Sequence, residues 1–203
     1  MTTKPAEDDP GTLGPEADPP ATPGEVRDGS ATPKWLFDLL DREVEESTGH
    51  GFDLDAAASP WNSKCAEYFD EQTDALKQDW SAFRAIWCNP PFKAALIGSF
   101  ASKAIEAAEA GSIVVLLLPH WPGYDWFQAI KRRGQIRDVI GPVRFKHHDG
   151  GVAVLNNGRF SVSLVVALLG PHVPPATNGP PIRRPPTPKP PPGTRRPGRG
   201  LPD

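Results

Sequence analysis

The sequence predicts a three-layer α/β domain, with helices on both faces of a mostly parallel sheet and an antiparallel hairpin near its C-terminal end. Helical and strand patterns alternate from residue 33 to residue 132. The continuous apolar run 113–118 is typical of a strand buried on both faces. Strand-like stretches separated by turn signals then follow up to residue 168. We expect such a sheet to bind ligands at the carboxyl ends of its strands.

Proline content and charge separate the two ends of the chain from its middle. Residues 1–30 hold six prolines and seven acidic residues, and residues 171–203 hold thirteen prolines and six basic residues. Such segments bury too little apolar surface to offset the entropy of the chain. We therefore expect a folded domain at 31–170 between two disordered tails. The basic tail could contact phosphates without reading bases, or serve only as a solvated linker.

Composition also excludes several classes of protein. Cys65 and Cys88 are too few for a disulfide scaffold, and no cluster of cysteine and histidine predicts a metal site. The longest apolar run, 113–118, is too short to cross a membrane, and the N-terminus lacks the apolar core of a signal peptide. We expect a cytoplasmic protein that binds neither a metal nor a membrane.

The first helix is expected to begin at Thr32-Pro33, because threonine can cap a helix and proline suits its first position. An apolar face at helical spacing carries the helix to about Glu46. The residues of this face are Leu36, Phe37, Leu39, Leu40 and Val44. A short strand is expected next, at 52–55.

The segment 59–80 fits neither regular state well. We expect only a short helix near 62–68 and a weak strand near 74–76 within it. A buried strand at 85–88 then delivers Asn89 to its carboxyl end. The next helix has apolar residues at 97, 100, 101, 104, 105 and 108 and ends near Gly111. The remaining elements are expected at 113–118 (strand), 124–132 (helix), and 136–140, 143–146, 152–155 and 160–168 (strands).

The most specific chemical signal is the turn Asn89-Pro90-Pro91-Phe92. The side-chain oxygen of Asn89 and the carbonyl of Pro90 can accept both hydrogens of an amine whose lone pair is conjugated into a ring. Holding both hydrogens localises that lone pair and makes the nitrogen a better nucleophile. The prolines stiffen the turn, and Phe92 offers a flat face to a planar group. An ordinary Pro-Pro turn after a strand is the alternative.

Further motifs surround this turn in a fixed order. They are the segments 31–37, 52–58, 62–69, 74–76, 79–80, 114–119 and 126–127. The ordered series resembles the phage-type DNA N6-adenine methyltransferases, small enzymes of phages and prophages. This resemblance implies a Rossmann-like methyltransferase sheet, S-adenosyl-L-methionine as the methyl donor, and DNA in a bacterial host cell as the substrate. It leaves the oligomeric state unknown.

The loop after the first strand would hold the donor in such an enzyme. Asp55, followed by Ala56 and Ala57, resembles the Asp-x-x-x-Gly/Ser loop whose carboxylate meets the donor's ammonium group. The match is imperfect because alanines replace glycines, and packed alanines beside a solvated aspartate are the alternative. Asp53 stands two positions earlier, so both side chains point to one face of a strand. Asp53 is therefore a second candidate for this role.

The resemblance also implies contacts with the two ends of the donor. Asp74 resembles the acidic residue that accepts a hydrogen bond from the donor's adenine amine, although few flanking residues support the match. Thr32 and Pro33 correspond to a segment that covers the methionine end in related enzymes. Helix capping explains these two residues equally well.

The target base would be held by the turn. An adenine extruded from DNA would stack on Phe92 and give its N6 hydrogens to Asn89 and to the carbonyl of Pro90, and the methyl group would pass to nitrogen without a covalent enzyme intermediate. His120 and Trp121 are expected at the mouth where the base enters, where Trp121 could stack in the gap that the base leaves. Interface packing is the alternative for Trp121.

Two other classes of function remain open. The same turn serves methylation of amines in RNA and of glutamine in proteins, so the acceptor rests on resemblance. A catalytically silent DNA-binding accessory is the second class, and the intact turn at 89–92 argues against it. Cys88 precedes the asparagine inside a strand, whereas the nucleophilic cysteine of cytosine-5 methylation follows a proline. We therefore interpret Cys88 as a packing residue.

Overall fold

The computed structural model describes residues 30–155 and 162–186. Its helices are α1 (Lys34–Thr48), α2 (Ala94–Glu109) and α3 (Asp125–Arg133), with short 3-10 helices η1 (Ala75–Lys77) and η2 (Trp80–Ala82). Its strands are β1 (Leu54–Asp55), β2 (Ala85–Cys88), β3 (Ile113–Pro119), β4 (Gln135–Ile140), β5 (Val143–Lys146), β6 (Val152–Leu155), β7 (Leu164–Leu169), β8 (Thr177–Asn178) and β9 (Ile182–Arg183).

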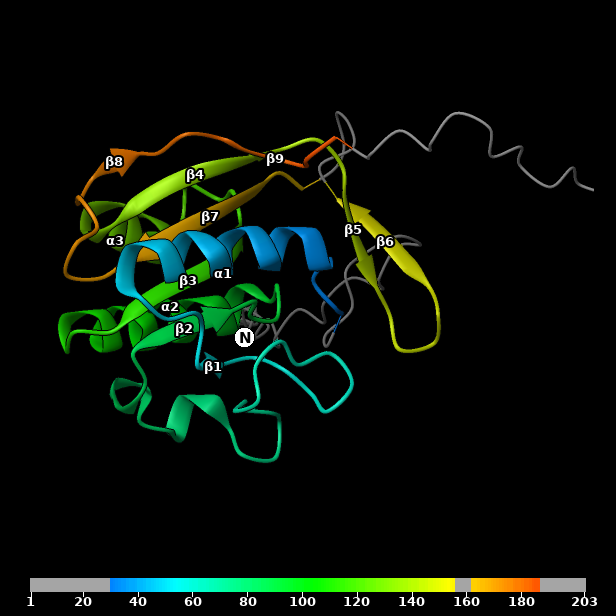
Figure 1. Cartoon of the computed structure of the whole chain (residues 1–203), viewed down its shortest axis with the longest axis horizontal. Helices are drawn as coiled ribbons and strands as arrows, with labels where there is room; N and C mark the ends of the chain where they lie inside the picture. The colour runs from blue at the N-terminus through cyan, green and yellow to red at the C-terminus, as the bar shows by residue number, and fades with distance from the viewer. Residues whose placement is uncertain (1–29, 156–161, 187–203) are drawn as a thin grey trace, which may run out of the picture.

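The main sheet has the strand order β1-β2-β3-β7-β4-β8, and β9 also pairs with β4 (Figure 1). Strands β1, β2 and β3 run parallel, and β8 and β9 run parallel to β4. Strand β7 lies antiparallel between β3 and β4. Strands β5 and β6 form a separate antiparallel hairpin. The mixed α/β class, the mostly parallel sheet and the antiparallel hairpin are thus confirmed.

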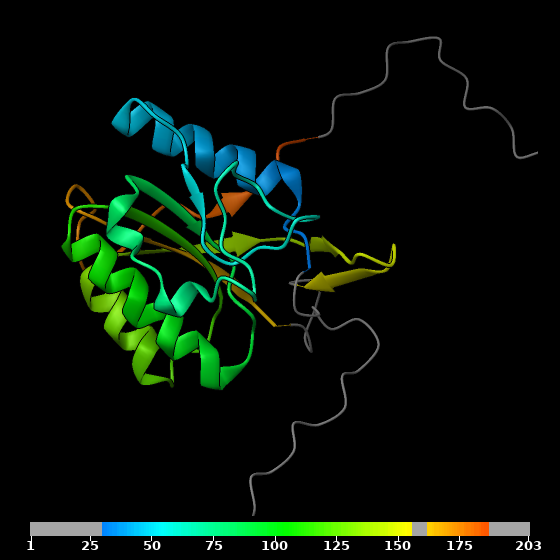
Figure 2. The same ribbon diagram turned by 90° about the horizontal axis from the view of Figure 1, so that it is seen from below.

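Helices cover both faces of the sheet, with α1 on one face and α2 and α3 on the other (Figure 2). The sheet separates two hydrophobic cores, and alternate residues of β2 belong to each. Ile86 and Cys88 pack with α2 and α3, whereas Ala85 and Trp87 pack with α1. This alternation follows from the two-residue period of a strand. From Val114 onwards β3 is buried on both faces, as the apolar run predicted.

The start of α1 and the segment after β1 differ from expectation. The N-cap of α1 is Pro33, and no side chain forms a capping hydrogen bond there. Thr32 therefore does not cap the helix, contrary to expectation. No helix forms at 62–68; instead the backbone of Glu67 and Phe69 pairs with Asp55 and covers the free edge of β1. The expected strand at 74–76 is the 3-10 helix η1, because the Asp74 side chain accepts a hydrogen bond from Leu76 N–H.

The sheet continues beyond the boundary expected at residue 170. Ile182 in β9 is buried in the core beside α1. Arg137 in β4 donates from Nε to the Pro180 carbonyl at 2.8 Å and pairs with Glu43 of α1. Of the tails expected at 1–30 and 171–203, residues 1–29 and 187–203 lie outside the described residues. Among the helices described, none has the length and apolarity to span a membrane.

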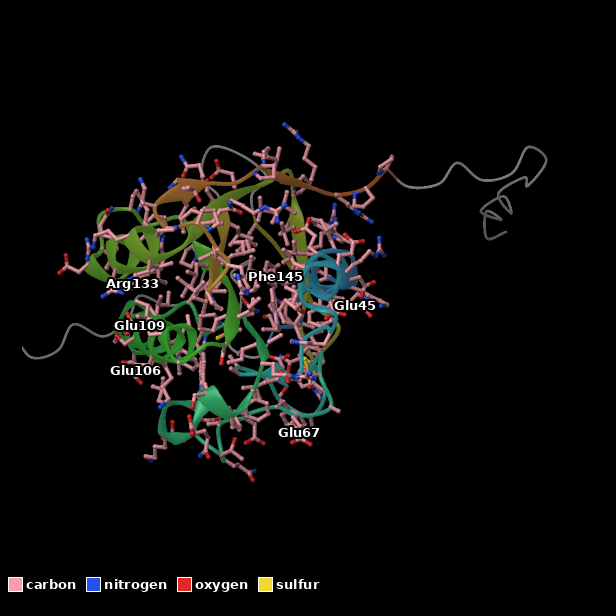
Figure 3. The ribbon with its side chains drawn as sticks, turned by 60° about the vertical axis from the view of Figure 1, so that its left-hand side comes forward. Glu45, Glu67, Glu106, Glu109, Arg133 and Phe145 are labelled. Carbon is pink, nitrogen blue, oxygen red and sulfur yellow. The ribbon has the colours of Figure 1, made fainter. Side chains whose placement is uncertain are left out.

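Side-chain packing fixes the outer elements against this frame (Figure 3). Phe145 of the β5–β6 hairpin is fully buried in the core that α1 covers. On the opposite face, Arg133 at the end of α3 reaches Glu109 at the end of α2, with 3.1 Å between Nε and Oε1. Both helices are thereby held together at the end of the sheet where β2 and β3 begin.

Candidate active site

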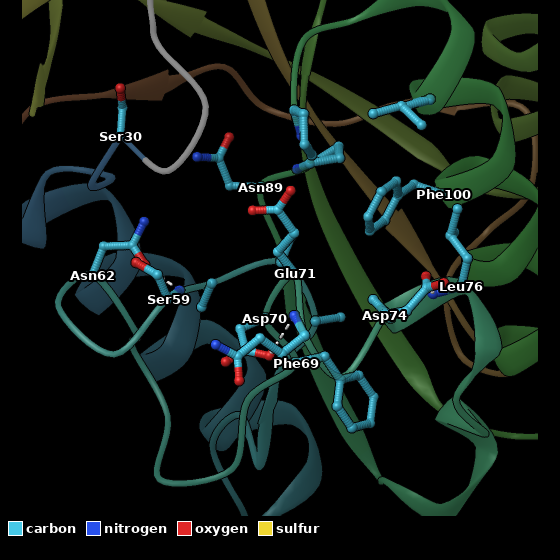
Figure 4. A pocket seen from close by; sticks show the side chains of 18 of the residues that line it. Ser30, Ser59, Asn62, Phe69, Asp70, Glu71, Asp74, Leu76, Asn89 and Phe100 are labelled. Atoms are coloured by element: carbon cyan, nitrogen blue, oxygen red, sulfur yellow. Dashed lines mark hydrogen bonds between the residues drawn. The ribbon is translucent and has the colours of Figure 1, made fainter.

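A cavity of about 720 Å³ opens where β1 and β2 end (Figure 4). Parallel pairing sets Asp55 beside Trp87, so the residues after both strands meet at this edge. The cavity is lined by three groups of residues. They are Ser30, the segment 56–62 with 69–72 and 74–76, and the segment 89–93 with Leu96 and Phe100. The volume lies within the range of small-molecule sites.

The turn after β2 forms one wall of this cavity. Pro90 is buried, and Phe92 is half-buried, packing against both cores. The Oδ1 atom of Asn89 is buried and has no hydrogen-bond partner among the described residues. Buried polar atoms are nearly always paired, and an unpaired acceptor costs about 1–3 kcal/mol. The unpaired oxygen therefore suits a ligand that donates a hydrogen.

A second cavity of only about 10 Å³ adjoins Asn89. It is lined by Ser30, Thr32, Asp55, Ala57, Asn62, Lys64, Trp87 and Asn89. The Asp55 carboxylate is 2% exposed and accepts hydrogen bonds from the N–H groups of Lys64 at 3.0 Å and Ala57 at 3.4 Å. Burial outweighs these bonds and raises the pKa of Asp55 to about 6. Burial lowers the pKa of the neighbouring Lys64, and the negative charge of Asp55 partly opposes this shift.

Asp74 stands in the wall of the larger cavity, held in a backbone conformation rare for a residue with a side chain, with φ at 53°. One carboxylate oxygen accepts from Leu76 N–H, and the other lies 2.8 Å from Lys77 Nζ. The hydrogen bond with Lys77 lowers the pKa of Asp74, so this carboxylate stays ionised. The structure thus places an ionised carboxylate, paired with Lys77, in the cavity wall.

The rest of this wall is apolar or small. Phe69 and Phe100 line the cavity, and Ala56 is fully buried beside them. Alanine leaves room for a ligand to approach the backbone, as glycine would. Ala57 lines both cavities. A flat apolar group thus finds aromatic side chains on the wall that also carries Asp74.

Asp53 does not belong to this site, contrary to expectation. Its carboxylate accepts hydrogen bonds from the N–H groups of Arg84 at 3.1 Å and Ala85 at 2.9 Å. Arg84 directly precedes β2 and Ala85 is its first residue, at the opposite end of this strand from Asn89. Asp53 therefore tethers two strands and lines neither cavity.

His120 and Trp121 also lie apart from the two cavities. The His120 ring stacks on Phe127 of α3 with 5.4 Å between centroids, and Trp121 packs on Tyr124 and Trp126. The aromatic residues at the start of α3 thus hold both side chains, and the expected place at the cavity mouth is not observed. Thr32 does line the smaller cavity, whereas Pro33 lines neither.

Several lining residues had no clear signal in the sequence. Asp70 lines the cavity and accepts hydrogen bonds from the N–H groups of Thr73 and Gln72. Trp61 is 40% exposed at the cavity and was not singled out. The only signal for Trp61 in the sequence is a tryptophan next to a proline in a segment without regular structure. Cys88 is fully buried in the core, which confirms its packing role.

No group of three or more potential ligands that could hold a metal ion occurs in the described parts of the chain. Residues 20–170 match the DNA N-6-adenine-methyltransferase (Dam) family. Over 76 residues the chain is 38% identical to a DNA N-6-adenine-methyltransferase of Escherichia phage T1. That alignment covers 37% of this chain and 31% of the phage protein, so it spans about a third of the relative.

Proposed function

This chain belongs to the DNA N-6-adenine-methyltransferase (Dam) family, and from this premise we propose that it moves a methyl group from S-adenosyl-L-methionine to N6 of adenine in DNA. One observation carries the proposal. The buried, unpaired Oδ1 of Asn89 stands at the end of β2, next to Pro90 and in the wall of a cavity large enough for a ligand.

Asn89 and Pro90 would prepare the amine for reaction. The N6 lone pair of adenine is conjugated into the ring, so the free amine is a poor nucleophile. Asn89 Oδ1 and the Pro90 carbonyl can accept one N–H hydrogen each and stabilise the positive charge that develops on nitrogen. Phe92 would stack on the base, which must leave the duplex for its amine to reach the turn.

The residues of the two cavities fit the methyl donor, which when bound supplies the methyl group from a sulfonium. Asp55 keeps free lone pairs beyond its two backbone hydrogen bonds, and an ammonium group would offset the desolvation that raises its pKa. Asp74 offers a fixed acceptor for an adenine amine, between the apolar side chains of Phe69 and Phe100. Thr32 lines the small cavity next to Asp55 and would lie near the amino-acid end of the donor.

The fold supports the same assignment. The order β1-β2-β3-β7-β4, with helices on both faces and β7 reversed, favours a Rossmann-like methyltransferase sheet. Family membership and the phage relative favour an enzyme encoded by a phage or prophage that acts in the cytoplasm of a bacterial host.

Acceptor class is tested by incubating the full chain with methyl-labelled donor and duplex DNA, RNA or a host lysate, followed by digestion to nucleosides or peptides. We expect the label in N6-methyladenine of DNA, and at least about 10²-fold less with the Asn89→Ala variant. Label in RNA or in glutamine instead would overturn the acceptor. Donor binding without any transfer would indicate a catalytically silent accessory protein.

A further inference from the structure

The β5–β6 hairpin projects away from the main sheet near the start of α1 (Figures 1 and 2). One of its faces is locked to the domain, because Val143, Phe145 and Ala153 are fully buried in the core that α1 covers. The hairpin is therefore a rigid extension of the domain. Nothing in the proposed chemistry at Asn89 requires such an extension.

The other face of the hairpin is exposed and positively charged. Arg144 and Lys146 alternate with the buried residues of β5, so both side chains point outward. Lys146 lies opposite Val152 of β6, which is 48% exposed. Neither cation forms an ion pair with a described residue. Two unpaired cations two residues apart stand about 7 Å from each other along the strand.

The turn of the hairpin reaches the cavities of the candidate site. His147 Nδ1 lies 2.8 Å from Ser30 Oγ, and Ser30 lines both cavities. The His148 ring packs edge-on against Trp61 at the larger cavity, with 5.3 Å between centroids. Backbone hydrogen bonds between Ala31 and Lys146 fasten the same segment. These contacts connect the charged face of the hairpin to residues that line the cavities next to Asn89.

We propose that the outer face of this hairpin, defined by Arg144, Lys146 and Val152, binds the phosphate backbone of duplex DNA beside the adenine being methylated. This inference rests on the proposed function, since it takes DNA as the substrate. Unpaired cations on a rigid strand suit phosphates, which fix the position of a protein on DNA without reading bases. Contacts from the turn to Ser30 and Trp61 place the bound duplex at the cavity that would receive the base.

The basic cluster at the end of α3 does not fit this role equally well. Lys131, Arg132 and Arg133 end α3, where cations favour the helix dipole. Arg133 is already paired with Glu109, at the end of the sheet away from Asn89. Lys131 and Arg132 are exposed and supply a matched control with the same charge.

The test is DNA binding by the full chain over a salt series. Each phosphate contact contributes about −0.9 to the slope of log affinity against log salt. The double variant Arg144→Gln/Lys146→Gln should flatten that slope by up to about 1.8 and weaken binding about 30-fold at 0.15 M salt. The control Lys131→Gln/Arg132→Gln should match wild type. Val152→Lys, which adds a cation to the same face, should steepen the slope by about 0.9.

The outcomes separate this inference from the proposed function. Equal losses in the double variant and its control would mean that overall charge drives binding, which overturns a dedicated hairpin surface. An unchanged slope in both the double variant and Val152→Lys would also overturn it. N6-methyladenine formation by the wild type is scored separately, so DNA binding through the hairpin without methylation would refute the function alone. Thermal unfolding of each variant verifies that the fold is retained.

Discussion

The polar side chains at the two ends of the central sheet differ in whether the protein supplies their hydrogen-bond partners. At the end where β2 and β3 begin, the protein itself satisfies them: Asp53 accepts hydrogen bonds from Arg84 and Ala85 N–H groups, and Ser112 Oγ donates to the Phe83 carbonyl at 2.7 Å. At the end where β1 and β2 finish, Asn89 Oδ1 is buried without a partner among the described residues. Asp55, only two positions from Asp53, is buried deeply enough to raise its pKa to about 6.

This difference identifies the functional end of the sheet. A buried polar group that the protein leaves unsatisfied lowers stability, and such groups cluster where a ligand supplies the missing partner. Residue type does not distinguish Asp53 from Asp55. Their surroundings do, because Asp53 bonds to the start of a neighbouring strand whereas Asp55 lines the smaller cavity beside Asn89.

The largest effects on turnover and stability should come from substituting one polar residue at each end of the sheet. Asn89→Ala should lower the turnover of methyl transfer about 10²–10³-fold, because Oδ1 is needed mainly as charge develops on the amine. Its unfolding free energy should not fall and should rise slightly, since that oxygen has no partner to lose and its unpaired burial is unfavourable. Ser112→Ala should do the reverse, with turnover kept and stability lower by about 1 kcal/mol. Steady-state kinetics and denaturant unfolding check the pair. Turnover above about a tenth of wild type in Asn89→Ala would refute its role.

The C-terminal strands offer the next largest effect. A chain ending at Gly170 loses Ile182, whose burial contributes about 1.5–3 kcal/mol, and leaves Arg137 without the Pro180 carbonyl. A chain ending at Pro186 keeps both and should unfold like the full chain. Urea unfolding of the two truncations compares them, and equal stability would show that β9 is dispensable.

A smaller loss is expected at Phe92. Stacking of a base on an aromatic ring contributes roughly 1–3 kcal/mol, so Phe92→Leu should weaken DNA binding while preserving much of the apolar packing. Phe92→Tyr should bind DNA nearly as well as wild type. Titration of single-stranded DNA with each variant measures this difference. Wild-type affinity in Phe92→Leu would make Phe92 a packing residue only.

The sequence predicted the site best where local pattern sufficed. Asn89 lies at a strand end because the apolar run 85–88 stops at two prolines, which cannot continue a central strand. Asp55 follows from the same reasoning at the preceding strand. The cavity wall at 59–80 was not predicted because it follows no regular pattern. Phe69 pairs with the distant Asp55, and Asp74 adopts a positive φ that its residue type does not indicate.

Asp53 and the residues after β3 show a second limit of prediction from the sequence. Pairing with β2 decides which end of the sheet each aspartate meets, and no local pattern contains that register. His120 and Trp121 were expected at the cavity because they follow a strand end, as Asn89 does. Packing on the aromatic residues of α3 takes them elsewhere.

The raised pKa of Asp55 makes stability depend on pH. Between the ordinary value of 3.8 and about 6, the folded protein binds more protons than the unfolded chain, so the free energy of unfolding falls as pH rises. Above about pH 6 this loss is complete and amounts to about 1–3 kcal/mol. Asp55→Asn removes the charge and should therefore stabilise the ligand-free protein at pH 8 but not at pH 4.

The most direct test of the comparison measures Asp55→Asn and Asp53→Asn side by side at pH 8, by denaturant unfolding without ligand and by calorimetry with S-adenosyl-L-methionine. We expect Asp55→Asn to be more stable than wild type, because removing the deeply buried charge outweighs losing the long 3.4 Å hydrogen bond from Ala57 N–H, and to bind the donor at least tenfold more weakly. Asp53→Asn should be less stable by about 1 kcal/mol, since an amide cannot accept both backbone hydrogen bonds, and should bind the donor normally. Destabilisation by Asp55→Asn with unchanged donor affinity would contradict the account, because Asp55 would then serve the fold as Asp53 does.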